Sequence, residues 1–395
     1  MINRRFLLRG LGGIACSAAA HPFLSTVTLA QSNGAAPLGD HRLIVVILRG
    51  AMDGLDAVQP VGDADFARLR PTLAGGGSDL DGFFALHPEL GGLMPMWQAG
   101  GLGFVHATST PYRDKRSHFD GQDLLEAGTG MDVPLAAVRD GWLNRMLQAV
   151  PGLSAETAYA VGRDAQPMLE GPAQARLWTP DVTLDLSAQS RLLLEHIYHD
   201  DDLFREAASE AMDLAAMGAP EGEEGGNARL ADIDTLVAFA SARLQAETRI
   251  AAFSLSGWDT HRRQKAAITT SFRRLQHLIL QLQAGLGAGV WGKTVLLAVT
   301  EFGRTVAENG SGGTDHGTGG VMLVAGGAVR GGRVMGQWPG LNETALYDRR
   351  DLMPTSDVRA WAAWAMRGMY GFDRGLLEGT VFPGLQMGDD PGLLL

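Results

Sequence analysis

Carboxylate and imidazole side chains follow or flank several apolar runs of the sequence. The segment GWDTH places an Asp and a His two residues apart behind a Gly-Trp turn. Hard divalent ions accept carboxylate oxygens, and imidazole adds affinity for Zn or Mn. Two such ions about 4 Å apart stabilise the entering and the leaving oxygen of a displacement. The candidate metal ligands are Asp53, Asp259, His261, Glu301 and His316.

Ser117 stands where the sequence predicts the start of a helix, so its side chain is expected to cap that helix. The helix dipole and metal coordination would also lower the pKa of its hydroxyl. A plain cap without chemistry is the alternative. His118 is expected to orient a neighbour or to cap the same helix, and is not counted among the ligands.

Basic side chains are the candidate substrate contacts. Arg113 and Arg116, with Lys115 between them, precede the predicted helix and could attract an anionic ester in an otherwise acidic protein. Arg304 could contact a substrate oxyanion or form a structural salt bridge. Taken alone, the basic residues of the loop also fit a solvated surface.

Apolar runs are expected to position these side chains. The run RLIVVIL is continuous, which is typical of a strand buried on both faces of a parallel sheet. Ligands of open parallel sheets bind outside the carboxyl ends of the strands, so residues distant in sequence can meet there. Strands are expected within residues 42–48, 101–108, 246–256, 293–304 and 313–327. We therefore predict an α/β protein with a mostly parallel sheet.

Length and composition fit one large globular domain, expected at residues 31–395. The chain has 395 residues, of which 45% are hydrophobic and 19% are charged, which excludes a disordered chain. Residues 190–217 and 228–244 have helical patterns and are joined by a Gly/Pro/Glu loop. They predict a helical insertion at about residues 185–245.

Residues 1–30 have the features of an export signal: a basic start, an apolar middle and small residues before position 30. The pair Arg4-Arg5, followed by Phe6-Leu7, resembles the twin-arginine type, which an export machinery of the bacterial inner membrane recognises. An ordinary secretory signal with a chance arginine pair is the alternative. Gly and Pro interrupt the apolar stretch, so no stable membrane anchor is expected.

Cleavage near position 30 would remove Cys16, the only cysteine. The mature protein would then have no thiolate ligand, so any metal would be held by oxygen and nitrogen. The segment carries three arginines and no acidic residue, so the net charge of −11 becomes −11 − 3 = −14. This acidity argues against a nucleic-acid partner.

The order of the candidate residues resembles the metal-site order of the alkaline phosphatase superfamily, whose members share an αβα sandwich and a two-metal centre. The segments RSHFDGQD, GWDTH, TEFGR and DHG look more closely like a family of twin-arginine-exported proteins in that superfamily, known only as a domain of unknown function. The likeness runs from about residue 42 to residue 367. It implies an αβα sandwich with divalent metal ions (Zn, Mn or Ca).

The resemblance also implies individual roles. Asp259, His261 and His316 would hold one ion. Asp53 and Glu301 would hold a second ion, and Ser117 would match the superfamily's nucleophile.

Two departures from the superfamily pattern affect the ligand sets. The Asp and His of the first ion are usually four residues apart, whereas Asp259 and His261 are two apart; alternate residues of an extended segment still share a face. At the second ion, Phe302 follows Glu301 where the superfamily has a His. One imidazole is thereby lost, and Asp315 is the candidate replacement.

Two functions remain open. The first is a metal-dependent hydrolase of phosphate or related esters in the bacterial periplasm, acting on a small anionic ester. The second is a non-catalytic envelope or binding protein that retains the fold. Sulfatase chemistry is disfavoured, because Ser117-His118-Phe119 does not match the Cys/Ser-x-Pro-x-Arg setting of sulfatases in that superfamily.

Overall fold

Strand β1 (Arg42–Arg49) arises from the RLIVVIL run and is buried on both faces. Ile44, Val46 and Leu48 pack into one hydrophobic cluster. Their neighbours, including Val45 and Ile47, pack into another. Side chains alternate across a strand, so a strand covered on both faces needs a continuous apolar run. The prediction of a doubly buried strand is confirmed.

The computed structural model describes residues 38–132, 140–180 and 226–395. These residues belong to one compact unit, Pro37–Leu395. The predicted export signal at 1–30, the predicted helix at 190–217 and the first part of the predicted insertion lie outside the described residues. None of the described helices is both long enough and apolar enough to cross a membrane.

The main sheet has nine strands in the described part of the chain, in the order β11-β5-β10-β9-β1-β8-β6-β7, with β12 paired to β5. Strands β9, β1, β8, β6 and β7 are mutually parallel. A second, three-stranded sheet has the order β2-β4-β3. The remaining strands are β2 (Val58–Gln59), β3 (Ser78–Asp79), β4 (Ala85–Leu86), β5 (Leu102–Ser109), β6 (Ala158–Val161), β7 (Arg176–Trp178), β8 (Ile250–Ser256), β9 (Thr294–Val299), β10 (Gly320–Ala325), β11 (Val334–Met335) and β12 (Ser356–Asp357).

Strand β10 runs against the rest of the sheet and pairs antiparallel with both β9 and β5. Its amino end therefore lies at the edge where its parallel neighbours have their carboxyl ends. The loop before β10 and the loops after β1, β5, β8 and β9 leave the sheet at this one edge. This reversal explains how His316, which precedes a strand, can meet Asp259, which follows one.

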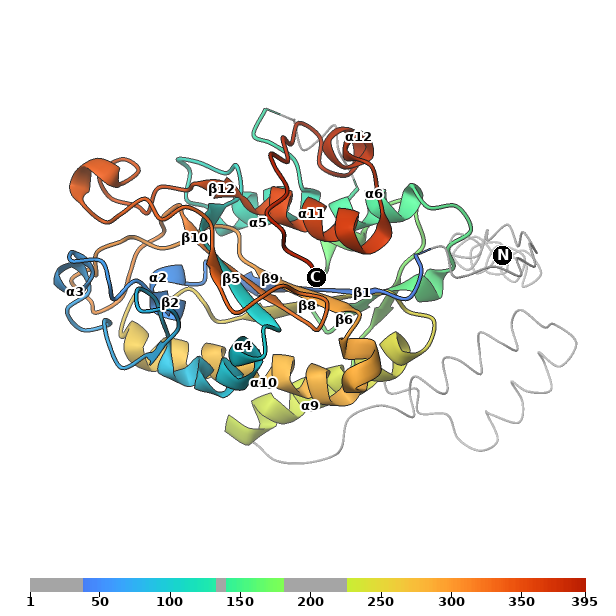
Figure 1. Ribbon diagram of the computed structural model, residues 1–395, viewed down its shortest axis with the longest axis horizontal. Helices are drawn as coiled ribbons and strands as arrows, with labels where there is room; N and C mark the ends of the chain where they lie inside the picture. Colours follow the sequence, from blue (N-terminus) through green and yellow to red (C-terminus); the bar gives the residue numbers. More distant parts are fainter. Residues whose placement is uncertain (1–37, 133–139, 181–225) are drawn as a thin grey trace, which may run out of the picture. The chain divides into compact units, whose positions relative to one another are not determined.

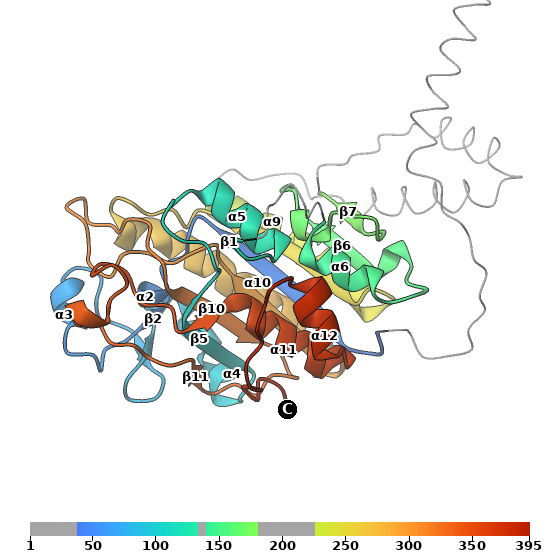
Figure 2. The same cartoon turned by 90° about the horizontal axis from the view of Figure 1, so that it is seen from above.

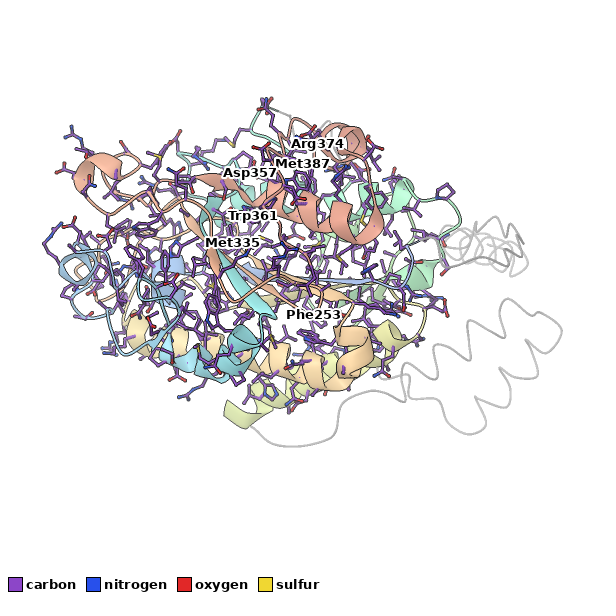
Figure 3. The ribbon with its side chains drawn as sticks, in the orientation of Figure 1. Phe253, Met335, Asp357, Trp361, Arg374 and Met387 are labelled. Atoms are coloured by element: carbon purple, nitrogen blue, oxygen red, sulfur yellow. The ribbon has the colours of Figure 1, made fainter. Side chains whose placement is uncertain are left out.

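Helices cover both faces of the sheet. Helices α4, α9 and α10 lie on one face, and α5, α6 and α11 lie on the other (Figure 1, Figure 2). Phe253 of β8 points toward the first layer and Trp361 of α11 lies in the second (Figure 3). The helices are α2 (Gly54–Ala57), α3 (Phe66–Leu69), α4 (Met94–Gln98), α5 (His118–Ala127), α6 (Trp142–Gln148), α9 (Gly226–Gln245), α10 (Gln264–Trp291), α11 (Val358–Tyr370) and α12 (Arg374–Leu376).

This architecture confirms the predicted α/β class, the mostly parallel central sheet and the αβα layering. Helix α9 confirms the helix predicted at residues 228–244. It packs on the sheet through Ile233, Val237 and Phe239, which are buried in the first hydrophobic cluster.

Two glycines bring the loop after β9 against the loop before β10. The amide of Gly303 donates to Thr318 O (3.0 Å), and the amide of Gly317 donates to Gly303 O (2.8 Å). A Cβ on Gly303 would lie 1.9 Å from Gly319 O. Only a residue without a side chain therefore allows this contact, which sets the Phe302 ring beside His316.

Gly303→Ala should lower the free energy of unfolding by about 2 kcal/mol or more, because backbone must move to admit the methyl group. Gly289→Ala is the control. Gly289 lies in α10, and a methyl group on its Cα would have no neighbouring atom within 4 Å, so alanine should stabilise there by about 0.5–1 kcal/mol. Urea denaturation of both variants measures the difference, and equal stabilities would contradict the close-approach argument.

Candidate metal centre

The GWDTH loop between β8 and α10 is fixed by its tryptophan. Trp258 is fully buried, its Nε1 donates to Leu255 O (2.9 Å), and its ring packs edge-on against Phe272 of α10. Gly257 supplies a positive φ of 101°, which an L side chain rarely adopts. With Trp258 held inward, the side chain of Asp259 is left at the surface of the sheet edge, with 44% of it exposed.

Three imidazoles meet at one carboxylate oxygen of Asp259. Its Oδ1 lies 3.0 Å from His261 Nε2, 3.2 Å from His316 Nε2 and 3.4 Å from His118 Nε2. The Nε2 atoms of His261 and His316 are 3.0 Å apart. Ligand atoms of His118, Asp259 and His316 all lie within 4.8 Å of one another. We refer to these four residues as the imidazole–carboxylate cluster.

Each imidazole of the cluster is held by its other ring nitrogen. Nδ1 of His118 is 2.8 Å from Glu301 Oε1, Nδ1 of His261 is 3.2 Å from Asp315 Oδ1, and Nδ1 of His316 is 2.8 Å from Arg116 O. All three partners are oxygen acceptors, so each Nδ1 carries a hydrogen, and each Nε2 faces the cluster, where it can bind a cation. Metal-binding histidines are oriented in this way in proteins.

The cluster suits a divalent cation. Three lone pairs and a carboxylate repel one another unless protons or a cation lie among them. The Nε2 atom of His118 is buried without a hydrogen-bond partner. Zn–N bonds of about 2.0–2.1 Å in a tetrahedral site separate the donors by about 3.3 Å, close to the 3.0–3.4 Å between Asp259 Oδ1 and the three nitrogens. Three nitrogens and one oxygen favour Zn or Mn over Ca, which prefers oxygen ligands.

Glu301, which follows β9, is fully buried behind His118. Its Oε1 accepts hydrogen bonds from His118 Nδ1, Gln122 Nε2 (3.0 Å) and the amide of Gly50 (2.9 Å), and its Oε2 accepts one from Thr300 Oγ1 (2.8 Å). Burial disfavours its charge, but these hydrogen bonds outweigh burial and hold the pKa of Glu301 below its ordinary value. The bond to Glu301 in turn raises the pKa of His118. Glu301 therefore contacts the cluster through His118 rather than through Asp259.

Asp53 lies in a separate buried network. Both of its oxygens are bound by the guanidinium of Arg70, at 2.6 and 3.1 Å, and Gln264 Nε2 donates to its Oδ2 (2.6 Å). It also caps α2 by accepting from the amides of Leu55 and Asp56. Burial disfavours its charge, yet Arg70 and Gln264 hold the pKa of Asp53 below the ordinary value. Among the described residues, Asp53 is not part of the imidazole–carboxylate cluster.

Ser117 caps α5, as the sequence predicts, by accepting a hydrogen bond from the amide of Asp120 (3.3 Å). The hydroxyl of Tyr112 accepts a hydrogen bond from the amide of Ser117 (2.7 Å). The cap places His118 at the first helical position and turns its ring into the cluster. Arg116, immediately before the cap, has a φ of 55°. Such left-handed conformations of non-glycine residues are concentrated at functional sites.

The three arginines predicted to bind substrate have different surroundings. Arg113 donates through Nη1 to the carbonyls of Thr110 (2.6 Å) and Tyr112 (2.7 Å). The side chain of Arg304 is fully buried and its Nη1 donates to Asp259 Oδ1 (2.8 Å). Arg116 is exposed. Arg304 thus forms a buried salt bridge with Asp259, which was the alternative to a substrate contact.

His118 is the member of the cluster that was not expected to be a ligand. The signal in the sequence was its place directly after a predicted cap, in the same SHFDGQD segment as Ser117. Its ring contacts come from distant segments: it stacks on Phe302 (5.1 Å between centroids) and packs edge-on against His316 (4.2 Å). No local pattern encodes those contacts.

Glu301→Gln should lower the affinity for Zn by roughly tenfold to a hundredfold, because the anionic partner of His118 is replaced by a neutral one. Competition with a chromogenic chelator measures it. Glu89→Gln is the control, since Glu89 pairs with Arg273 on the surface and should leave the affinity unchanged. An unchanged affinity in Glu301→Gln would contradict the proposed hold on His118.

Asp56, beside Asp53, should give the protein a distinctive pH dependence. Burial and the charge of Asp53 raise the pKa of Asp56 to about 7. In the unfolded chain this carboxyl ionises near pH 4. Its contribution to stability is therefore complete below about pH 4 and is lost as the pH rises through 7.

Asp56→Asn removes that ionisation while keeping an oxygen that can accept the hydrogen bond from Gln264 Nε2. Relative to wild type, the variant should gain stability between pH 4 and pH 8, by at most about 4 kcal/mol. Urea midpoints across this range measure the change. Parallel pH profiles of the two proteins would show that Asp56 ionises normally.

Comparisons with known proteins give a family and several weak structural likenesses. No curated protein matches the chain. Among solved structures, the chain is similar to the lipoteichoic acid synthase LtaP from Listeria monocytogenes (9% identity, TM-score 0.40, 88% of this chain and 76% of that chain). It is also similar to the C-terminal periplasmic domain of EcEptC from Escherichia coli in complex with Zn (9%, 0.36, 74% and 75%). A third likeness is to a TAB5 alkaline phosphatase mutant with Mg bound (10%, 0.34, 72% and 90%). These scores are too low to bear on activity.

The family model described as "Protein of unknown function (DUF1501)" matches residues 106–360, from β5 to the first turn of α11. The match includes all four residues of the imidazole–carboxylate cluster, together with Ser117 and Glu301. The match covers more than half of the chain, so the protein belongs to the DUF1501 family. This confirms the prediction that the chain belongs to a family known as a domain of unknown function.

Proposed function

We propose that the protein is a metal-dependent hydrolase of phosphate or related esters that works in the bacterial periplasm. One observation supports the proposal: three anchored imidazoles place their Nε2 atoms 3.0–3.4 Å from Asp259 Oδ1. Such a set of donors at the edge of an α/β sheet is suited to bind a catalytic ion. A bound divalent ion would supply Lewis-acid polarisation of the ester.

The proposal assigns one ion to His118, Asp259 and His316, with His261 as a further ligand. His118 and His316 are the less exposed imidazoles, at 23% and 17%, whereas His261 is 41% exposed. A second ion at Asp53 and Glu301 is not part of the proposal, because hydrogen bonds already occupy both carboxylates.

Ser117 is the proposed nucleophile. It precedes the ligand His118 by one residue and lies at the amino end of α5, where the helix dipole favours negative charge. Arg116 is the proposed substrate contact, because it is exposed and adjacent to Ser117. The guanidinium of Arg113 is occupied by backbone carbonyls, which makes it a support for this loop.

The periplasmic setting rests on the sequence. The Arg4-Arg5 pair and the apolar segment after it support export by the twin-arginine machinery, which would be the protein's partner during transport. Export by this route delivers folded protein, which suits a single large domain. The substrate would be a small anionic ester, since the acidic chain does not favour nucleic acid.

A set of variants tests the proposal and the non-catalytic alternative together. His118→Ala and Asp259→Asn should lose the bound metal and all hydrolysis, because each removes a ligand. Ser117→Ala should keep the metal but lose turnover by at least about a hundredfold, because a nucleophile contributes to the reaction more than to ion affinity. Elemental analysis of protein purified from the periplasm and a panel of phosphate mono- and diesters measure the two properties.

His277→Ala is the matched control. His277 lies on α10 and contacts Asp234 of α9 through its Nε2 (2.6 Å), so its loss should change neither metal content nor turnover. The enzyme proposal fails if wild-type protein loaded with Zn, Mn or Ca hydrolyses no ester and Ser117→Ala alters nothing. Retained metal with those two results would establish the non-catalytic binding protein.

A further inference from the structure

A chain of buried polar groups connects Asp259 to Asp53. Arg304 donates from Nη1 to Asp259 Oδ1 (2.8 Å), from Nη2 to Thr314 O (2.9 Å) and from Nε to Thr314 Oγ1 (3.2 Å). All three nitrogens of its fully buried side chain are thus directed. The fork of a guanidinium fixes the relative positions of the groups it binds. Arg304 therefore links Asp259 to both the backbone carbonyl and the hydroxyl of Thr314.

The hydroxyl of Thr314 is the branching point of this chain. It accepts from Arg304 Nε, donates to Gln264 Oε1 (2.7 Å) and lies 3.4 Å from Asp53 Oδ2. Thr314 is completely buried. The amide of Gln264 then donates to Asp53 Oδ2 (2.6 Å), and Arg70 binds both oxygens of Asp53. Three polar side chains, those of Arg304, Thr314 and Gln264, therefore connect Asp259 to Asp53.

Stability alone does not explain a buried network of this kind. Removing charged groups from water costs several kcal/mol each, and apolar replacements of similar volume are often as stable or more stable. A fully satisfied network instead fixes its members in one arrangement. Asp259 is the member of this network that reaches the surface, with 44% of its side chain exposed. Among the described residues, the side-chain partners of Asp259 are the three histidines and Arg304.

We infer that Thr314 and Arg304 are positioning residues that aim Oδ1 of Asp259 at the imidazoles, with the buried carboxylate of Asp53 fixing the far end of the chain. The inference rests on the proposed metal centre. It assigns Arg304 and Asp53 to the support of a ligand, in place of the substrate and ligand roles expected from the sequence. Metal affinity then depends on a hydroxyl that does not touch the ion.

Thr314→Val in the full-length protein removes this hydroxyl and keeps the volume. Its affinity for Zn should fall by about tenfold to a hundredfold, measured by chelator competition without any ester. Thr314→Ser restores the hydroxyl and should recover affinity to within about threefold of wild type. Thr318→Val is the control, because Thr318 lies in the same loop and donates to the buried carboxylate of Asp351 (2.9 Å) without a bond to Arg304. Its affinity should equal that of wild type.

A second measurement is independent of metal. In the apoprotein, Asp259→Asn should shift the urea midpoint less in the Thr314→Val background than in wild type, because the chain to Asp259 is already broken. The same substitution in the Thr318→Val background should be additive.

Unchanged Zn affinity in Thr314→Val, an equal loss in Thr318→Val, or an additive cycle for Thr314 with Asp259 would overturn the inference. If wild-type protein binds no ion, the proposed function fails, and the apoprotein cycle alone then decides whether Thr314 positions Asp259.

Discussion

The imidazole–carboxylate cluster depends on one carboxylate oxygen, Oδ1 of Asp259, which contacts three imidazole nitrogens and a guanidinium. The contact between Arg304 and Asp259 affects the charge that a bound ion would retain. Arg304 offsets the charge of the only carboxylate in the cluster, and imidazoles bind a metal ion as neutral donors. An ion held there would keep more of its positive charge than one bound by several free carboxylates. That residual charge would attract an anionic ester, which an acidic protein would otherwise repel.

The rest of the molecule brings the members of the cluster together and holds them in place. The doubly covered strands β1, β8 and β9 hold their carboxyl ends level, and the reversed β10 delivers His316 to the same edge. Gly303 and Gly317 then allow the loops after β9 and before β10 to touch. The buried partners Glu301 and Arg304 orient two members of the cluster from behind. Rigid strands and buried hydrogen bonds thus hold groups that would repel one another unless protons or a cation lay among them.

The sequence predicted the scaffold well, because continuous apolar runs and helix caps are local signals. RLIVVIL, the Ser117 cap and the helix at 228–244 were all recognisable in this way. The partners of the charged side chains were not predictable, since nothing near Asp53 indicates that Arg70 neutralises it. Glu301 likewise has the composition of a ligand, yet its hydrogen bonds come from α5 and from the loop after β1. Which carboxylate faces an ion and which faces a guanidinium is decided by tertiary packing.

Phe302 stands directly after Glu301, where the resemblance drawn from the sequence predicts a histidine. Its ring stacks on His118 (5.1 Å), lies 5.3 Å from His316 and stacks on Tyr112 (5.8 Å). Gly121 of α5 lets the helix approach, because a Cβ there would lie 2.9 Å from the Phe302 ring. A histidine at this position would add a ligand for a second ion but would bring a polar ring into a buried aromatic cluster. The phenylalanine instead holds two imidazoles of the cluster in place, and it packs the helix that Ser117 caps against them. The ring of Phe302 therefore supports two members of the imidazole–carboxylate cluster.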